Sequence, residues 1–596
     1  MAVLAIMTRK RLLGPHNEQT VDSYQIAGLA YHLGGRWKDA ENLQLGVMQT
    51  CKQVFGPEHP STLSSIANLA LTYRSRGRWK EAETLEVQVM ETRKRLLGPE
   101  HPDTLISIGN LAETYCNQGR WKEAEELQVQ VMDTHKQMLG PEHPDTLISI
   151  ANLASTYWNQ GRWKEAEELQ VQVMETSKQL LGPEHPNTLT SIASLAATYW
   201  NQGRWKEAEE LQVQVIETSK QVLGPEHPGT LISIGNLAET YWNQGRWREA
   251  EELQVQVMET RKLVLGPEHP STLISMGNLV STYWTQGRSK EAKDLNMQVI
   301  ETSKQLLGLE HPLTLISIAN LALTYWNQGQ WKEAEELQVQ VMETRKLVLG
   351  PEHPDTLISI GNLAETYCKQ GRWREAKELQ VQVMETSKQL LGPKHPDTLT
   401  SIASLASNYR NQGRWKEAEE LNVQVMETRT LVLGRKHPDT LASMADLAVT
   451  YGNQRRWKEA EELQVQVMET SKQLLGPKHP DTLTSMANLA ETYCNQRRWK
   501  EAEGLEVQVM ETRKLVLGPK HPDTLNSMNN LAYTLRSLGQ LAAALQLMTE
   551  CARLCGRILG PDHPETVSST FALNDWHGTA GHRMRAIFSR LLFRKK

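Results

Sequence analysis

Apolar side chains recur along the chain at the spacing of an amphipathic helix. In one stretch they stand at positions i, i+3, i+4 and i+7: Ile108, Leu111, Ala112 and Tyr115. This spacing places them on one face of a helix, and Pro102, a few residues earlier, suits a first helical turn. The pattern predicts a helix that begins near Pro102 and ends at Gln118–Gly119.

A second apolar stripe follows this glycine. From about Trp121 to Leu139, one side of the predicted helix carries four apolar residues: Ala124, Leu127, Val131 and Met132. Gly140 and Pro141 follow, and this pair typically ends a helix. The two stretches together predict a helix–turn–helix.

The same two-helix pattern returns every 42 residues. A His-Pro dipeptide marks the start of each unit, with its histidine at positions 59, 101, 143, 185, 227, 269, 311, 353, 395, 437, 479, 521 and 563. A single helix–turn–helix cannot bury its own apolar face, but stacked neighbours can. We therefore predict one all-α solenoid of about 13 helical hairpins, although 596 residues would ordinarily suggest several domains.

The residues of one unit carry a family resemblance. Leu111, Ala112, Tyr115, Gly119 and Ala124 form a pattern that resembles the tetratricopeptide repeat. The 42-residue period, with segments such as NLAETY, GRWKEAEEL and LGPEHPDTL, resembles the repeat domain of kinesin light chains over roughly residues 17–575. The Gly-Arg-Trp form of the units also resembles the C-terminal arrays of fungal NLR-like proteins. These resemblances imply a right-handed superhelix whose first helices line a concave groove.

We expect three segments along the chain. Residues 8–15 repeat residues 92–99, so residues 1–16 are expected to be the truncated second helix of a preceding repeat, in a chain cut from a longer protein. Residues 17–562 form the predicted repeat array, and residues 563–596 a C-terminal capping helix and basic tail.

The resemblance implies a non-catalytic scaffold that binds extended peptide segments of partner proteins. Kinesin heavy chain is an expected partner only if a coiled coil is missing from this chain. Self-association through the open N-terminal repeat is also possible, because exposed repeat ends favour it. The alternative function is the ligand-sensing repeat arm of an NLR-like NTPase whose nucleotide-binding domain is absent from this chain; no Gly-x-x-x-x-Gly-Lys-[Ser/Thr] loop occurs in it.

A second stripe on the first helix varies from unit to unit and is the candidate peptide groove. Its aromatic residues are Trp158, Trp200, Trp242, Trp284 and Trp326. Beside them run asparagines in the slot that resembles the cargo-contacting asparagine of kinesin light chains: Asn110, Asn152, Asn236, Asn278, Asn320 and Asn362. Rings would anchor an extended peptide and amides would pair with its backbone. The alternative is that both sets only pack within the scaffold.

Two other recurring motifs are given structural interpretations. The His-Pro histidines are too far apart for a metal array, since equivalent positions on packed helices lie roughly 8–10 Å or more apart; we interpret them as loop or helix-cap residues. The tryptophan of Gly-Arg-Trp is interpreted as a wedge between helices. We expect no metal, no cofactor and no catalytic site, because no unique cluster of reactive side chains stands out.

Composition narrows the remaining classes. With 65 basic and 70 acidic residues the net charge is −5, so nucleic acid is not an expected partner. No apolar run approaches the ~18 residues of a membrane span, so no integral membrane contact is expected. Six cysteines in 596 residues are too few for a disulfide scaffold and favour a cytoplasmic location.

Overall fold

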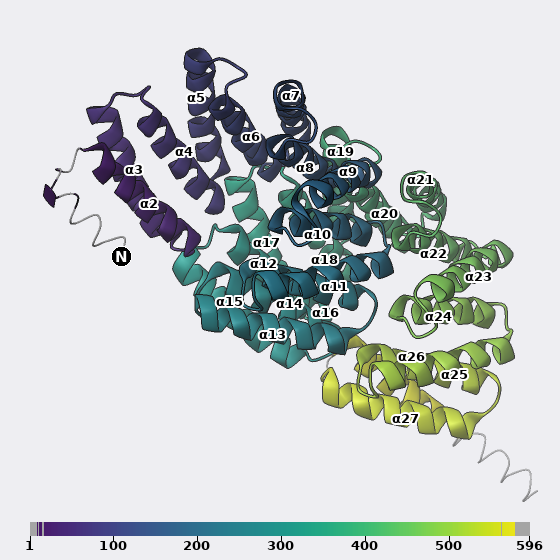
Figure 1. Ribbon diagram of the computed structural model, residues 1–596. Coiled ribbons are helices and arrows are strands. Elements are labelled where there is room, and N and C mark those ends of the chain that lie inside the picture. Colours follow the sequence, from purple (N-terminus) through teal and green to yellow (C-terminus); the bar gives the residue numbers. More distant parts are fainter. Residues whose placement is uncertain (1–8, 10, 13, 15–16, 562, 578–596) are drawn as a thin grey trace, which may run out of the picture.

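The computed structural model describes residues 9, 11, 12, 14, 17–561 and 563–577, and within them it consists of paired helices without a strand (Figure 1). Each pair stacks on the next along the chain, and the stack winds into a superhelix. The helices from α2 to α27 form thirteen hairpins. The prediction of an all-α solenoid of about 13 units is confirmed.

The first helix of each hairpin has nearly the same length throughout: α2 (Glu18–Leu33), α4 (Pro60–Ser75), α6 (Pro102–Asn117), α8 (Pro144–Asn159), α10 (Pro186–Asn201), α12 (Pro228–Asn243), α14 (Pro270–Thr285), α16 (Pro312–Asn327), α18 (Pro354–Lys369), α20 (Pro396–Asn411), α22 (Pro438–Asn453), α24 (Pro480–Asn495) and α26 (Pro522–Ser537). The second helices are slightly longer: α3 (Trp37–Val54), α5 (Trp79–Leu97), α7 (Trp121–Leu139), α9 (Trp163–Leu181), α11 (Trp205–Val222), α13 (Trp247–Leu265), α15 (Ser289–Leu307), α17 (Trp331–Val348), α19 (Trp373–Leu390), α21 (Trp415–Leu433), α23 (Trp457–Leu474), α25 (Trp499–Val516) and α27 (Leu541–Ile558).

The His-Pro dipeptide starts each first helix from α4 onward. In α6, the His101 Nδ1 accepts a hydrogen bond from the backbone N–H of Asp103 at 3.2 Å, and Pro102 occupies the first helical position. Proline suits this position because its missing N–H would have no partner there. In α2, Asn17 replaces histidine and its Oδ1 accepts from the Gln19 N–H. The interpretation of these histidines as helix caps is confirmed.

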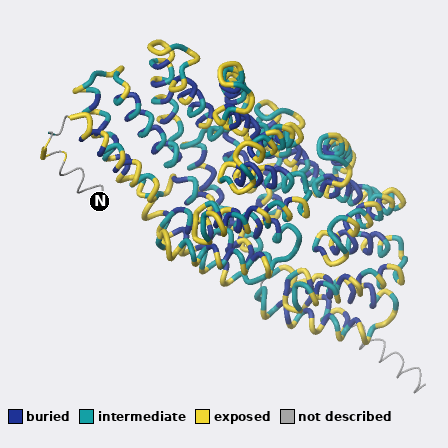
Figure 2. The backbone as a smooth tube through the Cα atoms, in the orientation of Figure 1, coloured by how far each residue is buried: buried dark blue, intermediate teal, exposed yellow. Residues whose placement is uncertain are grey.

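Apolar side chains fill the space between the helices of each hairpin and its neighbour. In the third hairpin, Leu105, Ile108 and Val131 are buried together, with Met90 of the preceding hairpin against them. Ala124 is fully buried, which allows the two helices to approach closely. Figure 2 shows these buried residues continuing along the whole stack. Stability therefore comes from contacts between neighbouring hairpins.

The Gly-Arg-Trp segment that joins the two helices of a hairpin, here called the corner, links consecutive hairpins. Arg120 lies over the Tyr115 ring at 3.9 Å. The same guanidinium pairs with Glu123 on its own helix at 2.5 Å and with Glu83 of the preceding hairpin at 2.7 Å. Since one cation serves two carboxylates and a ring, the corner holds its shape and its register with the next unit.

Corners also contact the following turn of the superhelix. The Nε2 of His353 donates to the carbonyl oxygen of Asn117, 236 residues earlier, at 3.0 Å. The ring of His353 stacks on Trp79 with centroids 5.2 Å apart. The same stack recurs at 5.2–6.1 Å in six pairs: Trp37–His311, Trp79–His353, Trp121–His395, Trp163–His437, Trp205–His479 and Trp247–His521. These contacts join residues 236 and 274 positions apart, so one turn of the superhelix takes about six units of 42 residues.

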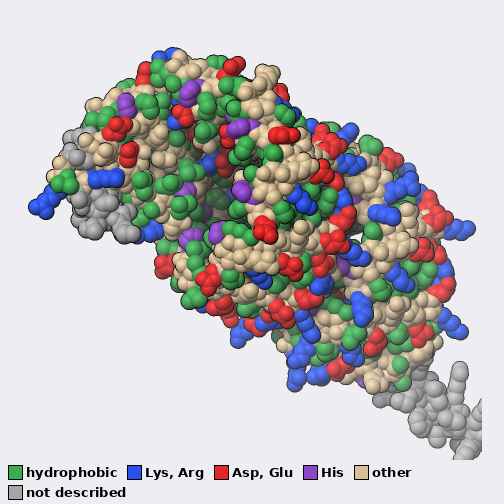
Figure 3. All heavy atoms as spheres, viewed as in Figure 1, with side chains coloured by type: hydrophobic (Ala, Val, Ile, Leu, Met, Phe, Trp, Pro, Cys, Tyr) green, Lys and Arg blue, Asp and Glu red, His purple; other side chains and the backbone are tan. Residues whose placement is uncertain are grey.

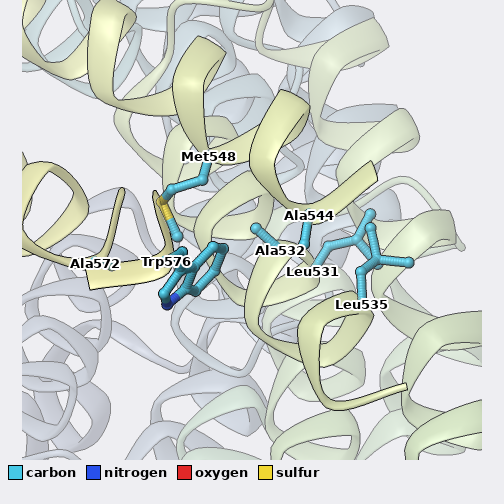
Figure 4. Close-up of a cluster of buried hydrophobic side chains, with 7 residues drawn as sticks. All are labelled: Leu531, Ala532, Leu535, Ala544, Met548, Ala572 and Trp576. Atoms are coloured by element: carbon cyan, nitrogen blue, oxygen red, sulfur yellow. The ribbon is translucent and has the colours of Figure 1, made fainter. Parts of the chain in front are cut away.

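A further helix over residues 564–577 covers the last hairpin. Its Trp576 is 1% exposed and lies in a cluster of buried apolar residues (Figure 4): Leu531, Ala532, Leu535, Ala544, Met548 and Ala572. The Tyr533 ring meets the Trp576 ring edge to face at 5.2 Å. The predicted basic tail beyond residue 577, and most of the truncated helix predicted at residues 1–16, lie outside the described residues.

Candidate peptide-binding groove

Pockets open between consecutive first helices, with a second helix as their floor. One pocket of about 470 Å³ lies between α6 and α8 over α7, and another of about 460 Å³ lies between α8 and α10 over α9. Both are lined by Ile148, Asn152 and Ser155 of α8, so they continue into each other. A smaller pocket of about 200 Å³ repeats the arrangement between α18 and α20. We call this row of pockets along the first helices the groove.

Three of the predicted asparagines line these pockets. Asn110 and Asn152 belong to the pocket over α7, and Asn362 to the one over α19. The Asn278 side chain donates to Glu239 at 3.4 Å. In the described part of the chain, the other five side-chain amides of the set make no hydrogen bond, so their donors and acceptors are available: Asn110, Asn152, Asn236, Asn320 and Asn362.

The five predicted tryptophans are half-buried, and four of them fall into two groups. The Trp242 indole N–H donates to Thr285 Oγ1 of the next hairpin at 3.1 Å, and Lys369 Nζ lies 5.1 Å from the Trp326 ring. These two contact the scaffold. By contrast, Trp158 lines the pocket over α9, and the indole N–H groups of Trp158 and Trp200 are buried without a partner among the described residues. Trp284 belongs to neither group.

Acidic side chains return on the groove face at every third hairpin. In the slot that begins with Leu71, an apolar residue, a glutamate and a serine follow one another in successive units, and this order of three repeats along the chain. Tyr533 replaces the serine in the last unit. The slot holds Leu71, Glu113, Ser155, Ala197, Glu239, Ser281, Leu323, Glu365, Ser407, Val449, Glu491 and Tyr533. The protein around Glu239 and Glu365 disfavours their charge and raises the pKa of both carboxyls. The groove is therefore acidic at regular intervals. Comparing this one slot across units reveals the order in the sequence.

Two buried carboxyls on the second helices were also not singled out by their sequence. Glu86 and Glu506 are 4% and 7% exposed and occupy a slot that holds glutamine in most units. Burial raises the pKa of both to about 7. In the equivalent position, Gln128 accepts a hydrogen bond from Thr156. A protonated glutamic acid resembles glutamine in shape and polarity, so these two sites read as structural.

A cavity of about 1120 Å³ lies between successive turns rather than in the groove. Trp121 and Trp163 line it from one turn, and the loops before His395 and His437 line it from the next. Because the turns touch mainly at corners, space remains between those contacts.

The described residues contain neither the arrangement typical of a metal site nor that of a membrane-spanning helix. Nowhere in residues 17–561 and 563–577 do three histidine, cysteine or acidic side chains gather as metal ligands would. None of the helices described is long and apolar enough to cross a bilayer.

The hairpin stack, its corner contacts and its groove define the class of helical-hairpin solenoids. Family models described as tetratricopeptide repeat match most of its length. One matches residues 103–170, 146–221, 191–262, 233–305, 313–386 and 360–427, and the other residues 20–61, 62–103, 440–481, 482–523 and 524–565. The chain belongs to the tetratricopeptide repeat family.

Solved structures add kinesin light chain-like neighbours. Two structures of a Podospora anserina putative kinesin light chain with nearly identical TPR-like repeats are each 38% identical to this chain. They cover 34% and 35% of it, with 97% and 98% of their own chains and TM-scores of 0.31 and 0.30. BtubC (BKLC) from P. vanneervenii is 18% identical over 40% of this chain and 92% of its own, with a TM-score of 0.31. A comparison with curated proteins finds no match.

Proposed function

We propose that this chain is a non-catalytic scaffold that binds extended peptide segments of partner proteins in its groove. The observation that carries the proposal is the continuous pair of pockets over α7 and α9, where free amides stand beside an unpaired indole N–H. Asn110 and Asn152 offer donors and acceptors to a peptide backbone, and Trp158 offers an apolar ring. Such a mixture suits a peptide better than an apolar helix.

The charge pattern narrows the class of peptide. Glutamates return at every third hairpin, and Glu239 shares its helix with Trp242. Both kinds of side chain favour lysine or arginine, which pair with carboxylates and lie over aromatic faces. The raised pKa of Glu239 and Glu365 fits this, because a cation from a ligand would offset the loss of solvation that disfavours the charge of these carboxyls. We therefore expect peptides with spaced basic residues to bind most tightly.

The finer partner assignments stay predictions. They are the absence of nucleic acid binding, the cytoplasmic location, kinesin heavy chain as a conditional partner, and self-association through the N-terminal repeat. The alternative function, the sensing arm of an NLR-like NTPase, also stays a prediction, and a phosphate-binding loop encoded upstream in the same frame would support it.

The test uses a displayed library of random 12-residue peptides, selected on the purified full chain. Selected peptides should bind at least tenfold more weakly to Trp158→Ala/Trp200→Ala, while helicity by circular dichroism is unchanged. The matched control is Trp415→Ala/Trp457→Ala, which removes two corner tryptophans outside the groove and should not affect binding. If the groove variant binds normally but unfolds at a lower temperature, the tryptophans only pack the scaffold and the peptide groove is wrong.

A further inference from the structure

The contact between turns has a strict steric requirement at the corner glycine. A Cβ atom on this residue would lie 2.5–2.7 Å from the Cδ of a proline in the next turn at six corners: Gly35, Gly77, Gly119, Gly161, Gly203 and Gly245. At Gly161, for example, the proline is Pro396, which follows the stacked His395. Carbon atoms do not approach so closely, so at these six corners only glycine allows a His-Pro cap to dock.

In the N-terminal part of the superhelix, the His-Pro caps do not pack against a corner of another superhelical turn. His59, His101, His143, His185 and His227 stack on no tryptophan in the part of the chain that the structure describes. The His143 side chain is 40% exposed, whereas His395, in the same slot one turn later, is 5% exposed. We call these five caps the N-terminal face. Figure 3 shows histidine side chains around a hollow on the visible side of the molecule.

In the C-terminal part, the corners do not pack against a His-Pro cap of another superhelical turn. Gly371 and Gly413 have open space where the earlier glycines meet proline, and Trp415 is 42% exposed. We call the corners at Gly371, Gly413, Arg455, Arg497 and Gly539 the C-terminal face. The two faces thus present the same two motifs, cap and corner, that meet between turns within the chain.

Two corners of the C-terminal face depart from the rule that glycine stands there. Arg455 and Arg497 occupy the glycine slot with φ of 62° and 64°, and they are the two non-glycine residues of the described chain with positive φ. A side chain in this conformation is strained. Both arginines are exposed, and neither side chain makes a hydrogen bond or an ion pair with the described residues. Their Cβ atoms stand where a docking proline would have to lie.

We propose that the N-terminal face of one copy of this chain fits the C-terminal face of a second copy, and that Arg455 and Arg497 block this head-to-tail stacking. A head-to-tail contact does not close on itself, so unblocked copies would form open chains. The two arginines hold the protein back from such assembly. This inference concerns surfaces outside the groove and stands independently of peptide binding.

Sedimentation velocity over a range of protein concentrations tests the proposal on the full chain. Arg455→Gly/Arg497→Gly should associate at least tenfold more tightly than the wild type. The matched control, Arg455→Ala/Arg497→Ala, removes the same two charges but keeps both Cβ atoms, and it should sediment like the wild type. Adding His101→Asn/His143→Asn to the glycine variant should weaken the assembly at least tenfold. Asparagine keeps the helix cap, as Asn17 does in α2, but loses the imidazole ring.

Three results would overturn the proposal. The first is a glycine variant that sediments like the wild type at every concentration. The second is an alanine variant that associates as strongly as the glycine variant, since charge rather than the Cβ atom would then be the barrier. The third is an assembly that survives the histidine substitutions, since another surface would then hold the copies together. Circular dichroism on each variant verifies that the helices are intact.

Discussion

Gly161 and Gly413 occupy the same slot in nearly identical units, yet their surroundings differ. Gly161 is covered by Pro396 of the next turn, whereas Gly413 has nothing within 4 Å. The local backbone is the same, with φ of 69° and 74°. A residue in this slot is therefore constrained in two ways. Its backbone must adopt the positive φ of the corner, and its side chain must leave room for the superhelical turn that packs against the corner.

The comparison explains where the repeats are free to change. At corners covered by another turn the slot is glycine without exception, and arginine enters it only on the uncovered C-terminal face, at Arg455 and Arg497. The local turn tolerates a side chain at the cost of backbone strain, but the covered corner does not. The packing of one superhelical turn on another, more than the backbone conformation of the corner, requires glycine at this position.

Arginine at a covered corner should have the largest effect. We expect Gly161→Arg to lower the local stability of α8–α10 by about 3 kcal/mol, because the strain of positive φ adds to the clash with Pro396. Gly413→Arg should cost only about 1 kcal/mol, from the strain alone. Hydrogen exchange of the backbone amides around each site measures both, since arrays of repeats open locally. Equal losses at the two sites would contradict the role of the covering turn.

The hairpins and the contacts between turns differ in how far the sequence predicts them. The helix over residues 121–139 and the cap at His101 follow from apolar spacing and from proline, and both agree with α7 and α6. The stack of Trp79 on His353 joins residues 274 positions apart. Its register depends on a small rotation between neighbouring hairpins, summed over more than six units, and no local pattern encodes that sum.

In the candidate groove, too, the sequence predicts some features and not others. Comparing equivalent positions across units identifies Trp158 as a variable surface position, and the family resemblance points to Asn152; both line a pocket. The same comparison does not separate Trp158 from Trp242, whose indole N–H bonds to Thr285. Which rings face the groove depends on the neighbour at each step, and threonine at that position is peculiar to one unit.

The buried and exposed histidine caps should respond differently to acid. Burial, with Arg76 nearby, lowers the pKa of His311 to about 4, and a bond to the Ser75 carbonyl opposes this. The unfolded chain, with a histidine pKa near 6.5, binds more protons between pH 6.5 and 4, so the stability that neutral His311 contributes is lost as pH falls through this range. At pH 7, His311→Asn should cost about 1–2 kcal/mol, from the lost Trp37 stack and carbonyl bond.

Lowering the pH to 5 should remove most of this difference between wild type and His311→Asn, because only the wild type then has a histidine to protonate there. The matched variant His101→Asn lies on the N-terminal face and should change local stability by less than about 0.5 kcal/mol at either pH. Hydrogen exchange of the first turns of α16 and α6 gives the two values. A difference for His311 that is independent of pH would show that the stacked ring does not titrate as its burial requires.

The smallest effect is expected at a corner where the chain itself lacks the ring. Ser289 stands in the tryptophan slot, and the cap 274 residues later is His563, which stacks on no aromatic ring among the described residues. The neighbouring contact is also loose, since a Cβ on Gly329 would lie 3.3 Å from Pro564, against 2.5 Å at Gly161. Ser289→Trp should restore the stack and stabilise the helix over residues 564–577 by about 0.5–1 kcal/mol.

Ser289→Ala is the control for this gain, because it changes the same position without adding a ring. Hydrogen exchange in residues 564–577 should slow in the tryptophan variant and stay unchanged in the alanine variant. An equal gain in both would point to helix propensity in α15 rather than to contact between turns. No gain in either would mean that the loose spacing at Pro564 is set by the capping cluster around Trp576, and that a ring alone cannot draw the two turns together.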